Sequence, residues 1–216
     1  MRSLSVQKLG DFHLAVRPGT DIPLALSLLN EIFINRWDDG AFLVRYTNAP
    51  FLVCEDTNRF LREKDVMEDG SDAPMICDVS GCMHPVSPGQ ELPAELKIAL
   101  EASGTYKGIA YRTGYLRLRE AAAFWSVEKA AAVWGVSDVL IRETAALFGK
   151  SKQAKVKVSQ GGYQRNRGGE AAVQAISLLN IVTGRIRGMT TPGGLGPLTR
   201  AEDPIGTCLL YTYPSP

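Results

Sequence analysis

The first regular pattern of apolar and polar positions lies near the N-terminus. Phe12, Leu14 and Val16 alternate with other residues, which predicts the end of a buried strand. Pro18 and Gly19 then indicate a tight turn. Apolar residues next recur at helical spacing up to residue 36, which predicts an amphipathic helix. They are Ile22, Ala25 or Leu26, Leu29, and Ile32 or Phe33.

The start of this helix admits two interpretations. Asp21 suits an N-cap position, and Pro23 is tolerated in a first helical turn because its missing N–H has no helical partner there. On the first interpretation, Thr20 and Asp21 form a helix cap and nothing more. Alternatively, the free N–H groups of a helix start attract an anionic ligand, and the carboxylate accepts hydrogen bonds from the amino edge of a base. Spacing alone favours the cap.

Shorter elements and an irregular stretch follow. We expect a short helix over residues 41–46, a strand over 51–54, a turn over 55–58 and a returning strand from 59 to 62. Residues 63–122 contain repeated prolines and no sustained period, apart from a strand predicted over 75–79. Residues 51–122 are therefore predicted to form an irregular or β-rich insertion.

Helical spacing returns in the last third of the chain. Ser126 and Ser137 each precede a predicted helix, the first ending at Gly135 and the second at Gly149. Residues 155–159 alternate like a strand, and 161–169 form a glycine-rich loop. A helix from 170 to 183 closes at Gly184. Helix, strand, loop and helix in this order predict an α/β fold.

Composition limits the class of protein. The chain has 216 residues, 45% hydrophobic and 22% charged, with a formal net charge of +1, which is typical of a globular protein. Nothing in this balance predicts a nucleic-acid partner or an anionic membrane. No apolar run approaches 18 residues, and the first residues resemble no signal peptide. Four cysteines do not indicate a disulfide framework.

The glycine-rich loop is the second candidate for ligand chemistry. Two glycine pairs, Gly161–Gly162 and Gly168–Gly169, allow a backbone to approach a ligand closely, and Arg165 and Arg167 could bind a phosphate or pyrophosphate through paired hydrogen bonds. The loop matches neither G-x-G-x-x-G nor G-x-x-x-x-G-K-[ST], so ordinary dinucleotide and P-loop sites are not predicted. From its chemistry alone, a ligand loop and a flexible connector are equally supported.

A metal site is the third candidate. Cys77, Cys82 and His84 lie close in sequence, as zinc ligands do. A structural site needs a second close pair, and the remaining Cys54, His13 and Cys208 supply none. Free thiols in a loop are therefore the favoured interpretation, and a zinc-stabilised interaction protein is the weaker one.

Several segments, in order, resemble the large catalytic subunits of the molybdopterin oxidoreductase family, the dimethyl sulfoxide reductase superfamily. They are HLAVRPGTD, FLVRYTNAPFLV with DTNRFLRE, WSVEKAAAVWGVSDVLIRETAALF, GGYQRNRGGEAAVQAISLLNIVTG and GMTTPGG. The resemblance implies α/β domains that hold a molybdenum (or tungsten) bis(pyranopterin guanine dinucleotide) cofactor. It also implies two-electron redox chemistry or oxo transfer on a small-molecule substrate, with an iron–sulfur electron-transfer subunit as partner.

The resemblance also assigns cofactor-binding residues. It implies that Gly19, Thr20 and Asp21 lie at the guanine end of one dinucleotide, with Asp21 accepting from the base. It places Gly161, Gly162, Arg165 and Asn166, and the turn at Thr183 and Gly184, near the cofactor. Where relatives have a pattern such as T-G-N-I-G-x-P-G-G, this chain has a longer turn with Arg185 and Arg187.

The same resemblance predicts that the chain is an internal fragment. The cysteine cluster for a [4Fe-4S] centre, the residue that ligates the metal and the C-terminal dinucleotide domain of the family have no counterpart in it. The fragment alone is expected to be inactive and metal-free. Residues 1–50 and 123–200 are predicted as pieces of cofactor-binding domains. Separately, residues 208–216 resemble a translated sequencing adapter and are predicted to be a tail that is not native to the protein. A non-enzymatic α/β nucleotide-binding module is the alternative.

Overall fold

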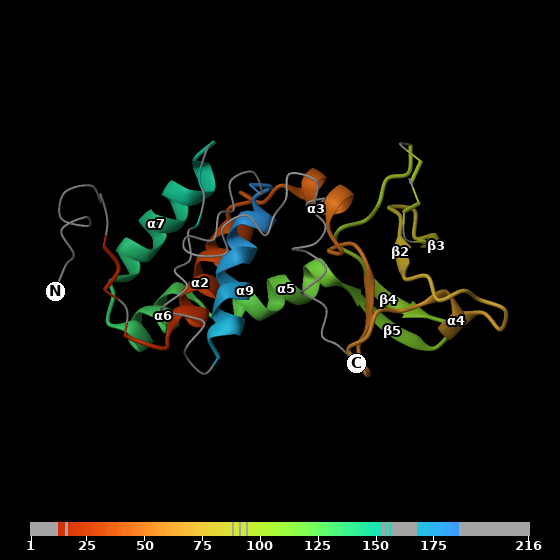
Figure 1. Cartoon of the computed structure of the whole chain (residues 1–216), viewed down its shortest axis with the longest axis horizontal. Coiled ribbons are helices and arrows are strands. Elements are labelled where there is room, and N and C mark those ends of the chain that lie inside the picture. The colour runs from red at the N-terminus through yellow and green to blue at the C-terminus, as the bar shows by residue number, and fades with distance from the viewer. Residues whose placement is uncertain are drawn as a thin grey trace, which may run out of the picture.

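The computed structural model describes residues 13–15, 17–87, 89–90, 92–93, 95–152, 154, 156 and 168–185. Its helices are α2 (Asp21–Ile34), α3 (Gly40–Tyr46), α4 (Glu63–Val66), α5 (Gly114–Ala123), α6 (Val127–Trp134), α7 (Asp138–Lys150) and α9 (Gly169–Val182). Its strands are β1 (Leu52–Cys54), β2 (Met75–Cys77), β3 (Met83–Pro85), β4 (Ser103–Tyr106) and β5 (Ile109–Thr113). Figure 1 shows most of the helices in one half of the molecule and the strands, together with the short helix α4, in the other.

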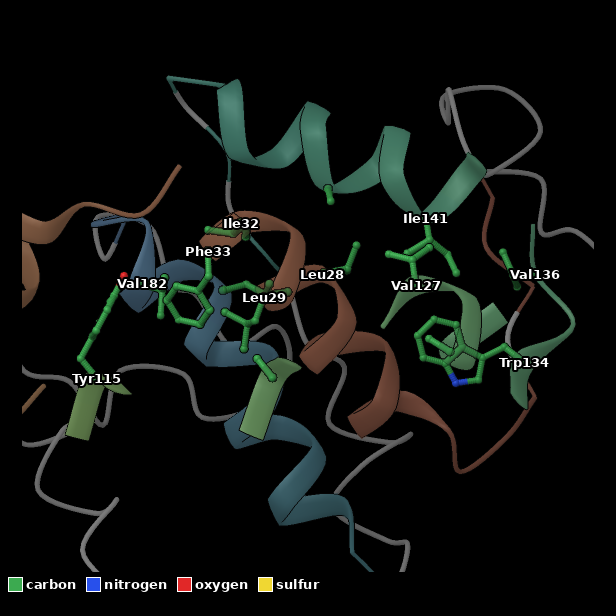
Figure 2. Packing of buried hydrophobic residues seen from close by; sticks show 14 of the residues in the cluster. Leu28, Leu29, Ile32, Phe33, Tyr115, Val127, Trp134, Val136, Ile141 and Val182 are labelled. Carbon is green, nitrogen blue, oxygen red and sulfur yellow. The ribbon is translucent and has the colours of Figure 1, made fainter. Parts of the chain in front are cut away.

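Helix α2 is the centre of the helical part, which comprises α2, α5, α6, α7 and α9. It packs against each of the other four, and Leu29 and Ile32 are completely buried. Figure 2 shows the core extending along α2, from Tyr115 and Val182 near Phe33 to Trp134 and Ile141. A helix covered on so many sides needs apolar residues around most of its circumference. This burial explains why α2 is the most apolar stretch in the first part of the chain.

The β part, formed by β1–β5 and α4, contains two small antiparallel sheets. One has the order β1-β5-β4, and the other pairs β2 with β3. The predicted return of the chain after β1 is confirmed, since Val53 pairs with Phe60 and the Leu61 N–H donates to the Leu52 carbonyl at 2.8 Å. A second hydrophobic cluster, around Leu52, Leu61 and Met75, lies between these strands.

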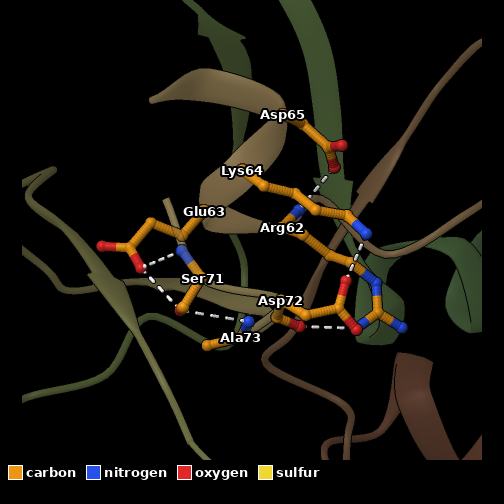
Figure 3. Close-up of polar contacts among 7 residues, drawn as sticks. All are labelled: Arg62, Glu63, Lys64, Asp65, Ser71, Asp72 and Ala73. Carbon is orange, nitrogen blue, oxygen red and sulfur yellow. Dashed lines mark hydrogen bonds and ion pairs between the residues drawn. The ribbon is translucent and has the colours of Figure 1, made fainter. Parts of the chain in front are cut away.

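Polar contacts hold the loop between α4 and β2 (Figure 3). The carboxylate of Asp72 accepts from the Arg62 guanidinium at 2.7 Å and lies 2.5 Å from the Lys64 amine. Glu63 accepts from both the backbone N–H and the hydroxyl of Ser71, at 2.9 and 2.6 Å. The loop is therefore fixed to α4 from both sides, although its residues are largely exposed.

The predicted α/β class is confirmed, and so are the helices after residues 20, 40, 126, 137 and 169. Three details were wrong. His13–Ala15, the described part of the first predicted strand, has no strand conformation. Gly149 lies inside α7, which continues to Lys150. Helix α5 forms where no helix was predicted. The tail at 208–216 lies outside the described residues, as does the strand predicted over residues 155–159 except for residue 156. The division into domains stays a prediction.

Candidate functional site

The turn that precedes α2 is open to solvent at Gly19. Gly19 has φ +83°, in the left-handed region that favours glycine, and a Cβ there would meet no atom within 4 Å. The hydroxyl and the backbone N–H of Thr20 both donate to the Arg17 carbonyl, at 2.7 and 3.3 Å. The Thr20 side chain thus closes the turn and leaves the helix start to other partners.

The cap of α2 differs from the prediction by one residue. Thr20 occupies the N-cap position and Asp21 is the first helical residue. The Thr20 side chain makes no capping hydrogen bond to this helix start, and Pro23 in the first turn has no N–H to donate. The end of the helix therefore carries the positive potential of its dipole, with the Asp21 carboxylate beside it. Thr20 thus occupies the N-cap position without making a side-chain capping bond, and whether the turn only begins the helix or also binds a ligand stays open at this point.

The end of α6 forms the other side of this corner. The Arg17 guanidinium donates to the Val133 carbonyl at 3.3 Å, and Gly135 follows in the left-handed conformation with φ +71°. Between them, Trp134 is 1% exposed, and its indole nitrogen has no hydrogen-bond partner. We call Arg17–Asp21 together with the end of α6 the α2 corner. Sequence analysis singled out Gly19, Thr20 and Asp21 in this corner. It assigned no role to Arg17 or Trp134, because neither belongs to a recognisable motif.

The predicted turn at Thr183 and Gly184 lies at the other end of α2. Its position is fixed by Asp39, soon after α2, whose N–H donates to the Val182 carbonyl at 2.9 Å. The Thr183 hydroxyl donates to the Leu179 carbonyl at 2.7 Å. Gly184 has φ +68°, and a Cβ there would come within 2.6 Å of an Asp39 carboxylate oxygen. Both residues are thus tightly packed, and only glycine fits the second position.

Arg185 ties this turn to the end of α7. Its guanidinium donates to the carbonyls of Phe148 at 2.7 Å and Gly149 at 2.9 Å, and also to that of Ser151. It lies over the Phe148 ring as well, 5.1 Å from the centroid. Burial lowers the pKa of Arg185 from its ordinary value. Arg185 therefore satisfies carbonyls at the C-terminal end of α7 that have no partner within the helix.

The structure does not bring the two predicted regions together. The 14 residues of α2 span about 21 Å and separate the corner from the Thr183–Gly184 turn. Figure 1 shows α2 and α9 running side by side in the same direction. The start of α9 therefore lies toward the corner, and its N-cap Gly168 supplies no side chain. Gly161, Gly162, Arg165 and Asn166 lie outside the described residues and precede this helix in the sequence.

The cysteine–histidine cluster does not form a metal site among the described residues. The His84 imidazole lies 2.9 Å from the Asp78 carboxylate, which also accepts from Ser80 and from the Cys82 N–H. Hydrogen bonds from Ser80 and His84 hold the pKa of Asp78 far below its usual range. Cys77 is buried, which raises its thiol pKa, whereas Cys82 is exposed. The zinc interpretation is therefore wrong for this set, which instead forms a hairpin turn.

A groove of about 430 Å³ lies among α3, α5 and α9. Its walls are mainly apolar, and its guanidinium, Arg117, already donates to the Cys54 carbonyl and to Asn58. None of the predicted site residues lines it. No helix in the part of the chain that the structure describes is both long and apolar enough to cross a bilayer.

Comparison with known proteins identifies the relatives of this chain. It is 30% identical over 152 residues to the dimethylsulfide dehydrogenase subunit alpha of Rhodovulum sulfidophilum, which covers 67% of this chain and 17% of the relative. It is also 30% identical over 154 residues to the chlorate reductase subunit alpha of Ideonella dechloratans, covering 68% and 17%. A shorter match, 46% over 55 residues, is to the perchlorate reductase subunit alpha of Dechloromonas aromatica (strain RCB), covering 26% and 6%. No family model matches the chain.

Among solved structures, the acetylene hydratase from Pelobacter acetylenicus has a similar fold, with a TM-score of 0.50 and 16% identity over 85% of this chain and 16% of that one. The homologues are catalytic subunits of molybdenum-dependent oxidoreductases, and the chain belongs to their family, the molybdopterin oxidoreductases of the dimethyl sulfoxide reductase superfamily. The resemblance seen in the sequence is thus confirmed. The chain spans about a sixth of the length of the first two relatives.

Proposed function

We propose that this chain is part of the catalytic subunit of a molybdenum or tungsten oxidoreductase, and that the α2 corner holds the guanine end of one pyranopterin guanine dinucleotide. The observation that carries the proposal is the start of α2. Its N-cap side chain is turned away into the preceding turn, and the Asp21 carboxylate stands at the first helical position. Homology to molybdenum-dependent enzymes supplies the cofactor class.

The residues at the corner match the chemistry of a guanine nucleotide. Guanine presents an N1–H and a 2-amino group as donors, and a carboxylate such as that of Asp21 accepts both. The backbone at exposed Gly19 carries no side chain, so a flat base could lie against it. The helix start favours the negative charge of a diphosphate. The corner offers one wall for such a ligand, since other parts of a whole subunit would have to supply the rest.

The remaining contacts are proposed from the family. Gly161, Gly162, Arg165 and Asn166 would approach the dinucleotide near the start of α9, while Thr183 and Gly184 would lie along its length, at the far end of α2. A ligand that touches both ends must be extended, as a dinucleotide is. The Thr183 hydroxyl already donates to the Leu179 carbonyl, and Asp39 occupies the space where a side chain on Gly184 would lie. We therefore propose that Thr183 and Gly184 contact the cofactor through their backbone only.

The cofactor, once bound, supplies the two-electron redox or oxo-transfer chemistry, while this chain's residues bind and orient it. A small-molecule redox substrate, a [4Fe-4S] centre in another part of the subunit and an iron–sulfur electron-transfer subunit complete the proposal. The described residues include no metal-ligand group, so the chain alone is expected to be inactive and metal-free. The alternative is a module that binds a guanine nucleotide and has no metal chemistry.

Metal and nucleotide analysis of the complete gene product tests the proposal. The whole protein, produced with molybdate and tungstate supplied, should contain stoichiometric metal and release guanine nucleotide on acid hydrolysis. The 216-residue chain should contain neither metal. Asp21→Asn in the whole protein should lower the retained guanine nucleotide, whereas Asp138→Asn, at the equivalent first position of α7, should not. A whole protein with guanine nucleotide and no metal would favour the alternative, and one with neither would overturn both.

A further inference from the structure

Trp134 has a buried N–H group without an acceptor. The residue is 1% exposed, and its indole nitrogen is the one buried side-chain nitrogen or oxygen, within the described ranges, that lacks a hydrogen-bond partner. Buried donors in folded proteins are nearly always paired, because an unpaired one loses its bond to water without compensation. Its labelled neighbours in Figure 2, Val127, Val136 and Ile141, are apolar. The surrounding core therefore provides no hydrogen-bond acceptor for the Trp134 N–H group.

The position of this N–H group is informative. Figure 2 shows the indole nitrogen on the ring edge that faces the ribbon leading into α2. The Arg17 side chain lies on the backbone at both sides of Trp134, donating to the Val133 carbonyl and passing 3.8 Å from a Cβ built on Gly135. The unpaired donor therefore belongs to the α2 corner, beside the uncapped helix start.

We propose that the Trp134 indole N–H donates a hydrogen bond to the O6 atom of the guanine base at the α2 corner. This inference rests on the proposed function. The guanine edge presents an acceptor, O6, followed by two donors, N1–H and the 2-amino group. Asp21 accepts from the donors, and Trp134 supplies the complementary donor. Adenine has an amino group where guanine has O6, so the pair of residues selects guanine.

The Arg17 side chain beside Trp134 can move at small cost. Arg17 is exposed and is held to α6 by a single long hydrogen bond of 3.3 Å. Gly19, also exposed, has the conformational freedom that such a movement needs. The base would displace Arg17 from the end of α6, and the guanidinium would then be free to meet the diphosphate.

Nucleotide analogues separate the two contacts. Inosine diphosphate retains O6 and N1–H but lacks the 2-amino group, whereas the diphosphate of 2-aminopurine riboside retains the amino group and lacks both O6 and the N1–H donor. Trp134→Phe should weaken the binding of GDP and of inosine diphosphate to the 216-residue chain by a similar factor, about three- to tenfold. It should leave the affinity for the 2-aminopurine analogue unchanged. An equal loss for all three ligands would instead indicate a packing role and overturn the proposal.

A spectroscopic measurement on the unaltered chain removes the dependence on this variant. The chain has three tryptophans, so ¹⁵N-labelled indole groups give three resolved N–H signals. Trp37→Phe and Trp125→Phe identify two of them, and the third belongs to Trp134. GDP should shift the Trp134 N–H proton downfield, and the 2-aminopurine analogue should not.

The outcomes also separate this inference from the function on which it rests. If GDP binds with an affinity that depends on Asp21, while the Trp134 signal does not move, the inference is wrong and the guanine-end proposal stands. If GDP does not bind to the chain, and Asp21→Asn leaves the guanine nucleotide retained by the whole protein unchanged, both are wrong.

Discussion

The helical part and the β part of the molecule are stabilised in different ways. In the helical part, one helix, α2, supplies buried residues to contacts with four others, and Leu29 and Ile32 at its centre are completely buried. In the β part, the strands are three to five residues long and the hydrophobic cluster is smaller. Polar side chains that bond to backbone groups, such as Glu63 to Ser71 and Asp78 to Cys82, fix its loops.

This difference determines what a sequence reveals. A helix that packs on many sides must repeat apolar residues every three to four positions, and that period is local in sequence. Short strands joined by polar turns depend on partners many residues away, such as Arg112 with Glu55 at 2.5 Å. We therefore expect core substitutions to be most damaging in the helical part, and the β part to respond chiefly to changes of polar groups and pH.

The largest effect is expected for Leu29→Ala. Leu29 is completely buried in α2, so the change should lower the free energy of unfolding by about 2–5 kcal/mol. Urea unfolding followed by far-ultraviolet circular dichroism measures it. Leu147→Ala, at a leucine of α7 that is 56% exposed, is the matched control and should change stability by less than about 0.5 kcal/mol. Similar losses for both leucines would contradict the central role of α2.

Gly149→Ala tests the packing between α7 and Trp37, which lies shortly after the end of α2. A Cβ at Gly149 would come within 2.4 Å of the Trp37 ring, so the ring or the helix must move. We expect a loss of about 1–3 kcal/mol, despite the better helix propensity of alanine. Gly40→Ala, where the nearest atom would be at 3.7 Å, should be neutral or stabilising. Thermal unfolding of both variants decides the matter, and a stabilised Gly149→Ala would show that this contact is loose.

Tyr115→Phe tests the contact between α5 and the end of α2. The Tyr115 hydroxyl donates to the Asp38 carboxylate at 3.0 Å, and its removal should cost about 1–2 kcal/mol. Burial, together with Asp38, raises the pKa of Tyr115 to about 12. The unfolded chain loses this proton near pH 10 and the folded chain later, so stability should fall as the pH rises from about 10 to 12. Urea midpoints across this range should fall less steeply for Tyr115→Phe. Parallel curves for the two proteins would contradict the assignment.

The smallest effect is expected for Asp78→Asn in the β2–β3 hairpin. Hydrogen bonds hold the pKa of Asp78 below its ordinary value, so its contribution is complete above about pH 4 and declines as the pH falls further. The protection factors of the Cys82 amide and of nearby amides, which compare observed with intrinsic exchange rates, should fall less steeply from pH 6 to pH 3 in Asp78→Asn. Asp69→Asn removes the same charge from an exposed loop and should keep the original slope. An unchanged slope in Asp78→Asn would contradict the role of this carboxylate.

Much of the helical part was predictable, and the exceptions have physical reasons. α6 and its Ser126 cap follow from local signals, and the Ser126 hydroxyl accepts from the Lys129 N–H at 3.3 Å. α5 was missed because Leu116 and Leu118 alternate with arginines, so the first turn lacks helical spacing. Gly149 was assigned as a helix end because its reason for being glycine, the Trp37 ring, lies far away in sequence. In the β part, Lys107 and Gly108 both have positive φ in the β4–β5 turn, a hairpin signal that a closer reading of Lys-Gly would have supported.

The candidate site was predictable only in part. Pro18–Gly19 and the helix start are local features, and the structure places them as expected, with the cap moved from Asp21 to Thr20. Arg17 and Trp134 join them through contacts between residues more than 100 positions apart. No spacing rule connects such residues. That Thr183 and Gly184 lie at the far end of α2 follows from helix packing, which the sequence does not display.

The most direct test of the account is titration of GDP and ADP into the 216-residue chain, its Asp21→Asn variant and its Asp138→Asn variant, followed by calorimetry. The account predicts that GDP binds in preference to ADP, that Asp21→Asn weakens GDP by about tenfold or more, and that Asp138→Asn does not. Equal GDP affinity in the unaltered chain and in Asp21→Asn would contradict the assignment of the α2 corner as the guanine end of the cofactor site.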